Sequence, residues 1–196
     1  MDLLERRDNI DIIRIYSKEE ALPYRASFVG AYQSIFAEPP YSERFYPTEA
    51  ESIFNQNLQT PGNITLLAVI YESVVGFAFG VPVMTRKAVT SKLRGLLHLQ
   101  HTFYLAELGV LERYRRQGLG RTLTQWRIDL IDPDSFNDVV LRTSVVKDSS
   151  YQMYRSMDFD DMGVYTEVSS RRTDGMVRTD RRLFLSRELQ QKSPSS

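Results

Sequence analysis

The segment at residues 108–121, LGVLERYRRQGLGR, holds residue types and spacings suited to binding an anion. Arg115, Gly118 and Gly120 give an Arg-x-x-Gly-x-Gly pattern directly after an apolar run. Glycines let a backbone curl closely around an anion, and the free amides at the start of a helix donate hydrogen bonds to it. Arginine adds charge suited to phosphate oxygens. The pattern predicts a phosphate-binding turn, and a Gly-rich turn with solvated arginines fits the local spacing equally well.

Glu107 is a candidate general base because it lies in the otherwise apolar run 104–110. Desolvation of a carboxylate raises its pKa towards the range that is useful for proton transfer at neutral pH. A strand-end salt bridge is the alternative interpretation of the same residue. His101 shares strand parity with Glu107 and has a suitable intrinsic pKa. Its position after a loop favours an ordinary surface histidine.

Tyr154 is a candidate general acid. A phenol with a pKa near 10 stays protonated at neutral pH and can give its proton to a leaving group. Tyr154 also fits a core tyrosine of an amphipathic helix, because Tyr151 lies one turn before it.

Strands and helices must position these groups. Strands are predicted at seven alternating or β-branched runs: residues 10–16, 64–71, 74–83, 102–110, 139–146, 162–169 and 177–186. Capping residues and helical spacing predict four helices: residues 17–37, 48–58, 119–130 and 148–157. The caps are capping boxes at residues 17–20 and 48–51, which begin with Ser17 and Thr48, and a cap at Asp148 or Ser149. Residues 85–100 are basic and polar and predict an exposed loop, and Gly109 is a candidate bulge.

The composition limits the function classes. The 196 residues fit one domain (1–196) with a core at about 10–186 and frayed ends at Met1–Arg7 and 188–196. A net charge of zero argues against a nucleic-acid binder. The chain has no cysteine and two histidines, which excludes thiol nucleophiles and disfavours metal sites. With neither a signal core nor a long apolar run, we expect a cytoplasmic protein away from membranes.

The element order and the turn together resemble the GNAT acetyltransferase superfamily, over about residues 10–186. The most specific match is VLERYRRQGLGRTL at 110–123, and the second is YQMYRSMDF at 151–159. Glu112 and Asp158 depart from the family's usual proline and glycine. The resemblance implies an α/β (α+β) GNAT fold, with a mixed, mostly antiparallel sheet of six to seven strands and about four flanking helices. The sheet would be splayed between the fourth and fifth strands, 102–110 and 139–146.

The resemblance also implies acetyl-CoA as a co-substrate and a set of residues that bind it. The main chain of the strand end would pair with the pantetheine arm, and the turn would hold the pyrophosphate. The implied binding residues are Leu108, Gly109, Val110, Arg115, Arg116, Gln117, Gly118, Leu119, Gly120, Arg121 and Thr122. A main-chain amide near Val110 would stabilise the oxyanion, and attack would be direct, without an acyl-enzyme.

We therefore expect an N-acetyltransferase for a small-molecule amine, with Glu107 as base and Tyr154 as acid. A protein N-terminus or lysine is the second acceptor class, and a catalytically silent acyl-CoA-binding domain is the rival from another class. A mononucleotide P-loop is disfavoured, because the turn lacks a Gly-Lys-Ser/Thr ending. A homodimer is left open. Seven aromatic residues could line the acceptor pocket or form core: Tyr24, Phe28, Tyr32, Phe36, Tyr41, Phe45 and Tyr46.

Overall fold

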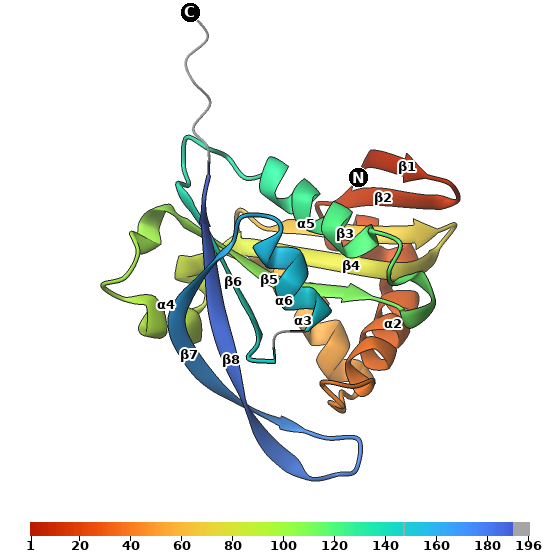
Figure 1. The fold of residues 1–196 in the computed structure, drawn as a ribbon. Helices are drawn as coiled ribbons and strands as arrows, with labels where there is room; N and C mark the ends of the chain where they lie inside the picture. The colour runs from red at the N-terminus through yellow and green to blue at the C-terminus, as the bar shows by residue number, and fades with distance from the viewer. Residues whose placement is uncertain (147, 190–196) are drawn as a thin grey trace, which may run out of the picture.

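Eight strands form a single twisted sheet in the computed structural model, which describes residues 1–146 and 148–189 (Figure 1). In chain order they are β1 (Asp2–Arg7), β2 (Ile10–Ile15), β3 (Ile64–Ile70), β4 (Ser73–Pro82), β5 (Thr102–Val110), β6 (Asp138–Ser144), β7 (Asp160–Arg171) and β8 (Val177–Glu188). Their spatial order is β1-β2-β3-β4-β5-β6-β8-β7. Among the strand pairs of the described residues, only β5–β6 is parallel, so the predicted mixed and mostly antiparallel sheet is confirmed, with one strand more than expected.

The additional strand is β1, and it corrects the prediction of a frayed N-terminus. Residues 2–7 pair antiparallel with β2. Leu4 packs against the core, and Glu5 accepts a hydrogen bond from Nε1 of Trp126 at 2.7 Å. Four of the six residues of β1 are charged, so the apolar runs used to predict strands did not include it. The predicted fraying of residues 188–196 is wrong for the first two of them: Glu188 pairs with Asp138 in the sheet, and the amide of Leu189 donates to the carbonyl of Asn137 at 2.7 Å. Residues 190–196 lie outside the described residues.

Helices cover both faces of the sheet (Figure 1). They are α1 (Lys18–Ala21), α2 (Arg25–Ala37), α3 (Pro47–Gln59), α4 (Lys87–Leu93), α5 (Leu119–Asp129) and α6 (Ser149–Arg155). Four short 3₁₀ turns connect elements: η1 (Leu22–Tyr24), η2 (Val83–Thr85), η3 (Leu99–His101) and η4 (Glu112–Tyr114).

Two of the three helix caps predicted from the sequence agree with the structure. Ser17 caps α1 and Asp148 caps α6, as predicted. The capping box predicted at Thr48 is wrong, because α3 begins earlier: Glu49 accepts a hydrogen bond from the amide of Tyr46 at 2.7 Å. Pro47 in the first turn of α3 is compatible with this start.

The prediction that residues 85–100 form an exposed loop is wrong in part. This segment contains α4, whose Val89 and Leu93 are buried against Tyr104 and Val140. Two apolar residues four apart are enough to anchor a short helix on the sheet, while the basic residues around them dominate its composition.

The core is divided by the sheet into two layers. On one face α2 and α3 pack Phe28, Tyr32 and Phe54 against Phe77 and Phe79 of β4. On the other face α5 and α6 pack on the central strands, with a cluster that includes Leu123, Tyr154, Phe103, Leu141 and Leu185. A residue on a central strand therefore faces one of two helical layers, and its parity decides which.

Strand β5 carries a bulge that controls the parity of Glu107. Glu107 pairs with Phe79 and Leu105 with Gly80, so Ala106 is an extra residue on β5. The bulge predicted at Gly109 is wrong, since Gly109 pairs regularly with Phe77. A Cβ on Gly109 would stand 2.5 Å from Cζ of Phe77, so close packing explains that glycine.

The sheet splays beside this bulge. The parallel β5–β6 pairing runs from Thr102 with Asp138 to Leu105 with Leu141, where it ends among the described residues. Beyond it β5 stays with β4, and β6 stays with β8. The main chain of residues 106–110 therefore has a free edge towards the gap, which confirms the predicted splay between these two strands.

Candidate active site

A groove runs along the free edge of β5 to the start of α5, and we call it the strand-edge groove. Its volume is about 460 Å³. It is lined by nine of the eleven residues that the sequence assigned to cofactor binding: Leu108, Gly109, Val110, Arg115, Arg116, Gly118, Leu119, Gly120 and Arg121. Residues from α6 and from the α2–α3 connection complete it, among them Ser150, Met153, Pro40 and Tyr41. Gln117 and Thr122 lie in the same turn but do not line the groove.

The turn at residues 115–122, which we call the glycine turn, has the backbone needed to bind an anion. Arg116 and Gly118 both adopt left-handed conformations, with φ of 63° and 81°. Gly118 is the N-cap of α5, so the amides of the first turn after it have no acceptor within the helix. Such a curled backbone at a helix N-terminus offers N–H donors and a favourable dipole to a phosphate.

The three arginines of the glycine turn differ in how much of their charge is available. Arg115 forms an ion pair with Glu38 at 2.6 Å and donates from Nε to the carbonyl of Val110. Arg121 donates to the hydroxyl and the carbonyl of Ser156. Within the described part of the chain, Arg116 has no hydrogen bond or ion pair, so its charge is the one free to meet a ligand.

Arg7 of β1 is hydrogen-bonded to the glycine turn, and the sequence analysis did not identify this residue. Its Nη1 donates to the hydroxyl of Thr122 at 2.8 Å, and its Nη2 donates to the carbonyl of Gln117 at 3.2 Å. The contact spans more than a hundred positions in the sequence, so only the pairing of β1 in the sheet could have revealed it.

A central cavity of about 270 Å³ lies beside the strand-edge groove and brings the two predicted catalytic residues together. Glu107 and Tyr154 both line it. It shares Tyr41, Leu108 and Ser150 with the strand-edge groove, so the two spaces adjoin. The splay that was inferred from sequence therefore leads from the glycine turn to Glu107.

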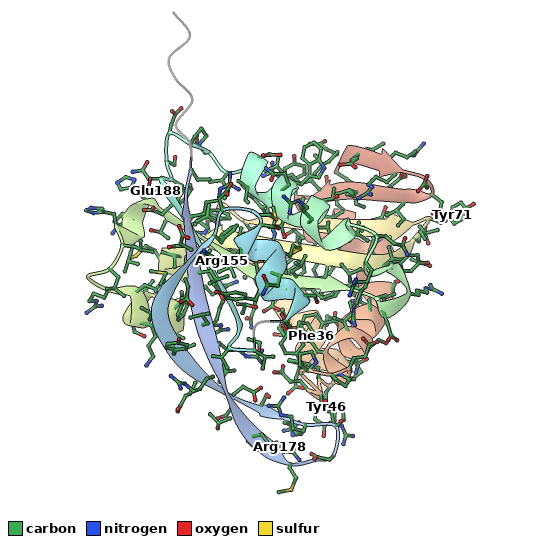
Figure 2. The ribbon with its side chains drawn as sticks, in the orientation of Figure 1. Phe36, Tyr46, Tyr71, Arg155, Arg178 and Glu188 are labelled. Atoms are coloured by element: carbon green, nitrogen blue, oxygen red, sulfur yellow. The ribbon has the colours of Figure 1, made fainter. Side chains whose placement is uncertain are left out.

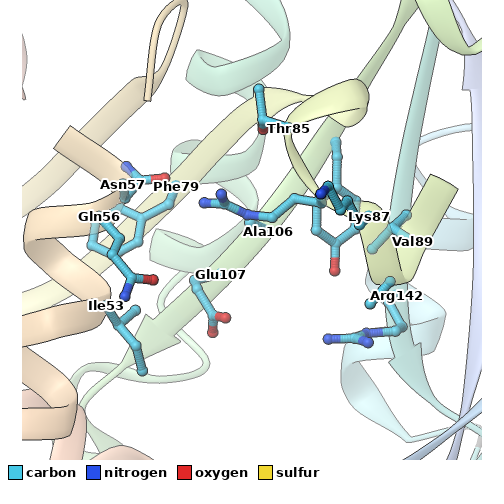
Figure 3. A pocket seen from close by; sticks show the side chains of 13 residues that line it. Ile53, Gln56, Asn57, Phe79, Thr85, Lys87, Val89, Ala106, Glu107 and Arg142 are labelled. Carbon is cyan, nitrogen blue, oxygen red and sulfur yellow. The ribbon is translucent and has the colours of Figure 1, made fainter. Parts of the chain in front are cut away.

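Glu107 also lines a third space, of about 470 Å³, which we call the outer pocket. Figure 3 shows the Glu107 carboxylate between Ile53 and Gln56 of α3 on one side and Arg142 of β6 on the other. The outer pocket shares Glu107 and Arg142 with the central cavity. Glu107 thus lies where the outer pocket and the central cavity adjoin.

Burial raises the pKa of the Glu107 carboxyl to about 7, against the opposing charges of Arg142 and Arg86. The bulge at Ala106 causes this environment, because it turns Glu107 to the face that also carries Tyr104. At neutral pH the carboxylate is therefore half ionised, and it can both accept and release a proton.

Burial also raises the pKa of the Tyr154 phenol, and the Arg127 guanidinium beside it opposes that rise. Arg127 was missed in the sequence. It is buried on α5 and donates from Nη1 to the carbonyls of Phe79 and Glu107, both at 3.0 Å. A charged residue on the apolar stripe of α5 was the available signal, four positions after the buried Leu123.

The structure separates His101 from this site. His101 is exposed in η3, and its Nδ1 lies 3.0 Å from the carbonyl oxygen of Ser135. The parity argument that placed it with Glu107 is wrong, because the bulge at Ala106 shifts Glu107 to the other face.

Four of the seven aromatic residues singled out in the sequence line the central cavity: Tyr32, Phe36, Tyr41 and Phe45. Tyr41 reaches both the central cavity and the strand-edge groove, and burial raises the pKa of its phenol to about 12. Phe28 is buried in the core instead. Tyr46, labelled in Figure 2, lies near the end of the β7–β8 hairpin. The guanidinium of Arg171 from that hairpin stands over its ring, 5.1 Å from the centroid.

The connection between α2 and α3, residues 38–46, is fastened to the β7–β8 hairpin. Glu43 and Arg182 form an ion pair at 2.8 Å with side chains about one-tenth exposed. Arg172 donates to the carbonyl of Tyr41 and pairs with Asp180 at 2.5 Å. Glu43 and Arg182 also line the central cavity, so this ion pair forms part of its wall.

Residues 1–146 and 148–189 contain no group of three or more histidine, aspartate or glutamate side chains arranged to hold a metal ion. None of their helices is long and apolar enough to cross a bilayer.

Comparison with protein families gives one match: a model described as the acetyltransferase (GNAT) family covers residues 29–159. Among curated proteins, a probable N-acetyltransferase family 8 member 5 of Mus musculus is 34% identical over 65 residues, 33% of this chain and 29% of that protein. N-acetyltransferase family 8 member 3 of Rattus norvegicus is 33% identical over 75 residues, 37% of this chain and 33% of that protein. The match therefore spans about a third of the length of these relatives.

Solved structures resemble the whole fold. An N-acetyltransferase from Staphylococcus aureus superposes with a TM-score of 0.63 at 15% identity, over 91% of this chain and 99% of that one. The ribosomal-protein-S18-alanine N-acetyltransferase from Escherichia coli gives 0.63 at 16% identity, over 95% and 98%.

Proposed function

The chain belongs to the GNAT acetyltransferase family, and from this premise we propose that it transfers an acetyl group from acetyl-CoA to the primary amine of a small molecule. The observation that carries the proposal is the position of Glu107. This carboxyl lies between the central cavity, which adjoins the strand-edge groove, and the outer pocket, and its pKa is about 7.

The strand-edge groove fits acetyl-CoA, which supplies an activated thioester carbonyl when bound. The left-handed Gly118 and the first-turn amides of α5 would hold the pyrophosphate, with charge from Arg116. The free edge of β5 at residues 106–110 would pair with the pantetheine arm, as an added strand does. Both requirements of the ligand, an anion cradle and an amide-rich edge, occur in one continuous groove.

Glu107 would act as the general base. A primary amine arrives mostly protonated at neutral pH and must lose a proton before it can attack. A carboxylate with a pKa near 7 takes that proton better than an ordinary glutamate, whose pKa lies near 4.3. The main-chain amide near Val110 would face the developing charge on the carbonyl oxygen.

Tyr154 would act as the general acid and give its phenolic proton to the departing sulfur. Its raised pKa keeps the proton in place at neutral pH. Arg127 would then limit the cost of the phenolate, because its guanidinium already lowers the pKa of Tyr154. Tyr41 is a second phenol at the junction with the strand-edge groove, and the experiment must separate the two.

The test is CoA release from acetyl-CoA over a panel of small amines and short peptides. We expect Glu107→Gln to lower kcat/KM by about 10²–10⁴-fold and Tyr154→Phe by about 10–100-fold. Acetyl-CoA binding, measured by calorimetry, should change little in either variant. Glu72→Gln, an exposed glutamate in the β3–β4 turn, is the matched control and should behave as wild type.

Four outcomes would contradict parts of this scheme. Full activity of both variants would remove the catalytic assignments. A loss in Tyr41→Phe but not in Tyr154→Phe would move the acid role to Tyr41. Binding of acetyl-CoA without turnover of any amine would favour the silent acyl-CoA-binding domain, and turnover of peptides alone would favour a protein acceptor.

A further inference from the structure

The outer pocket carries far more positive than negative charge. Among the described residues, three cationic side chains line it, Arg86, Lys87 and Arg142, and Glu107 is the only acidic one. A simple amine that enters as an ammonium ion would meet a surplus of like charge, which disfavours binding. An amine acceptor for this pocket therefore needs a compensating negative charge.

The two arginines of the outer pocket are partly buried, and their guanidinium groups have no hydrogen-bond or ion-pair partner among the described residues. Arg86 precedes α4, and Arg142 projects from the face of β6 that also carries the buried Val140. Neither guanidinium has a hydrogen bond or an ion pair among the described residues, whereas Arg172 and Arg182 nearby are held by carboxylates. Partly desolvated guanidinium groups without partners are sites for an oxyanion, and their planar fork matches a carboxylate.

The pocket also sets where that anion lies relative to the reacting amine. Figure 3 shows Arg142 on the opposite side of the pocket from α3, with Glu107 between them. Arg142 and Arg86 are close enough to Glu107 to lower the pKa of its carboxyl. An amine delivered to Glu107 would thus carry its anion only a few bonds away.

Resting on the proposed function, we propose that the acceptor is a small primary amine bearing a carboxylate, an amino acid or a derivative of one, whose carboxylate binds Arg86 and Arg142 while its amine faces Glu107. Lys87 is exposed at the mouth and adds long-range attraction. The pocket volume of about 470 Å³ leaves room for a side chain besides the two charged groups.

The experiment compares kcat/KM for phenylalanine, leucine and methionine with their carboxamides, followed by CoA release. The amine of the carboxamide is more readily deprotonated, so the carboxamide would be the faster substrate if charge recognition were absent. We expect the free acid to be preferred by at least tenfold. Arg142→Gln and Arg86→Gln should each reduce this preference by about 10–100-fold. Arg142→Lys should retain part of it.

Arg94→Gln is the matched control, because Arg94 is exposed beside α4 and does not line the outer pocket. It should leave the preference unchanged. Equal rates for acids and carboxamides, or an unchanged preference in both pocket variants, would overturn the inference and leave the proposed function intact. Turnover of peptides but not of free amino acids would also overturn it.

Calorimetric titration of phenylalanine onto the protein with CoA present provides a readout apart from activity. Binding that is lost in Arg142→Gln and kept in Arg94→Gln supports the carboxylate site even if no amine is acetylated, an outcome that would reject the proposed function alone. Absence of binding to the wild type would reject the carboxylate site.

Discussion

Arg127 donates a hydrogen bond from Nη1 to the carbonyl oxygen of Glu107 at 3.0 Å, from a side chain that is only 1% exposed. The same nitrogen reaches the carbonyl of Phe79, and the guanidinium also lowers the pKa of Tyr154. One buried cation on α5 therefore fixes the backbone of the proposed base beside the bulge and acts on the proposed acid. We regard Arg127 as a positioning residue.

Arg127→Met should reduce both stability and activity. Two buried carbonyls would lose their donor, which we expect to cost roughly 2–4 kcal/mol of unfolding free energy. Arg127 also lowers the pKa of Glu107, so its loss should shift the acidic limb of the pH–rate profile to higher pH. A purely structural role would leave that limb in place. Arg25→Met, at an exposed arginine of α2 paired with Glu51, is the control for both measurements.

The pH dependence of the wild type follows from Glu107. Below a pKa of about 7 the carboxyl is protonated and cannot accept a proton, so kcat/KM should fall about tenfold per pH unit. Above that value the rate should level off in this limb. Glu107→Gln should abolish the limb around pH 7. A profile that is identical in wild type and variant would show that another group titrates.

The raised pKa of Glu107 also predicts how the unfolding free energy changes with pH. The pKa of Glu107 is raised in the folded state, so its favourable contribution is complete below the unfolded pKa and is lost as pH rises through about 7. Unfolding free energy of the wild type should therefore decline between pH 5 and pH 8 relative to that of Glu107→Gln. Urea unfolding at the two pH values measures it, and a parallel change in both proteins would contradict it.

The extent to which sequence could predict this molecule depends on whether a feature is local. The glycine turn, the strand before it and the helix after it are contiguous, so spacing and caps identified them and the splay followed from the resemblance. The bulge at Ala106 arises from register against β4 and leaves no local mark. When the bulge is not taken into account, the alternation of side chains along the strand places His101 and Glu107 on the same face, which is wrong.

The missed charged residues share one cause. Their proposed roles depend on contacts between segments that are far apart in the sequence. These residues are Arg7, Arg86, Arg127 and Arg142. Charge in a sequence is most often solvated surface, so a pattern search treats such arginines as exposed. Arg127 was the exception with a detectable signal, since its helical position coincides with the buried stripe of α5.

Arg7 gives a test of the glycine turn that leaves the groove itself untouched. Arg7→Gln would remove the donors to Thr122 and to the carbonyl of Gln117, and the turn would be less ordered for the pyrophosphate. We expect acetyl-CoA affinity to fall about 3–20-fold in calorimetry. Arg6→Gln is the control, because Arg6 pairs with Asp11 on the surface. Equal acetyl-CoA affinities in the two variants would show that the hydrogen bonds of Arg7 have no role in binding acetyl-CoA.

Arg182 and Arg178 of β8 form a matched pair for testing the ion pair in the wall of the central cavity. Arg182 is paired with Glu43 in a buried environment, whereas Arg178 pairs with Asp174 with its side chain 62% exposed. Removing one partner of a buried pair leaves the other charge uncompensated, so Arg182→Met should cost about 3 kcal/mol of unfolding free energy. Arg178→Met should cost less than about 1 kcal/mol, because exposed pairs contribute little. The double variant Glu43→Gln, Arg182→Met should lose less unfolding free energy than Arg182→Met alone, because it has no unpaired Glu43 carboxylate. If urea unfolding gives equal losses for the two arginine variants, the hairpin does not hold residues 38–46 through this pair.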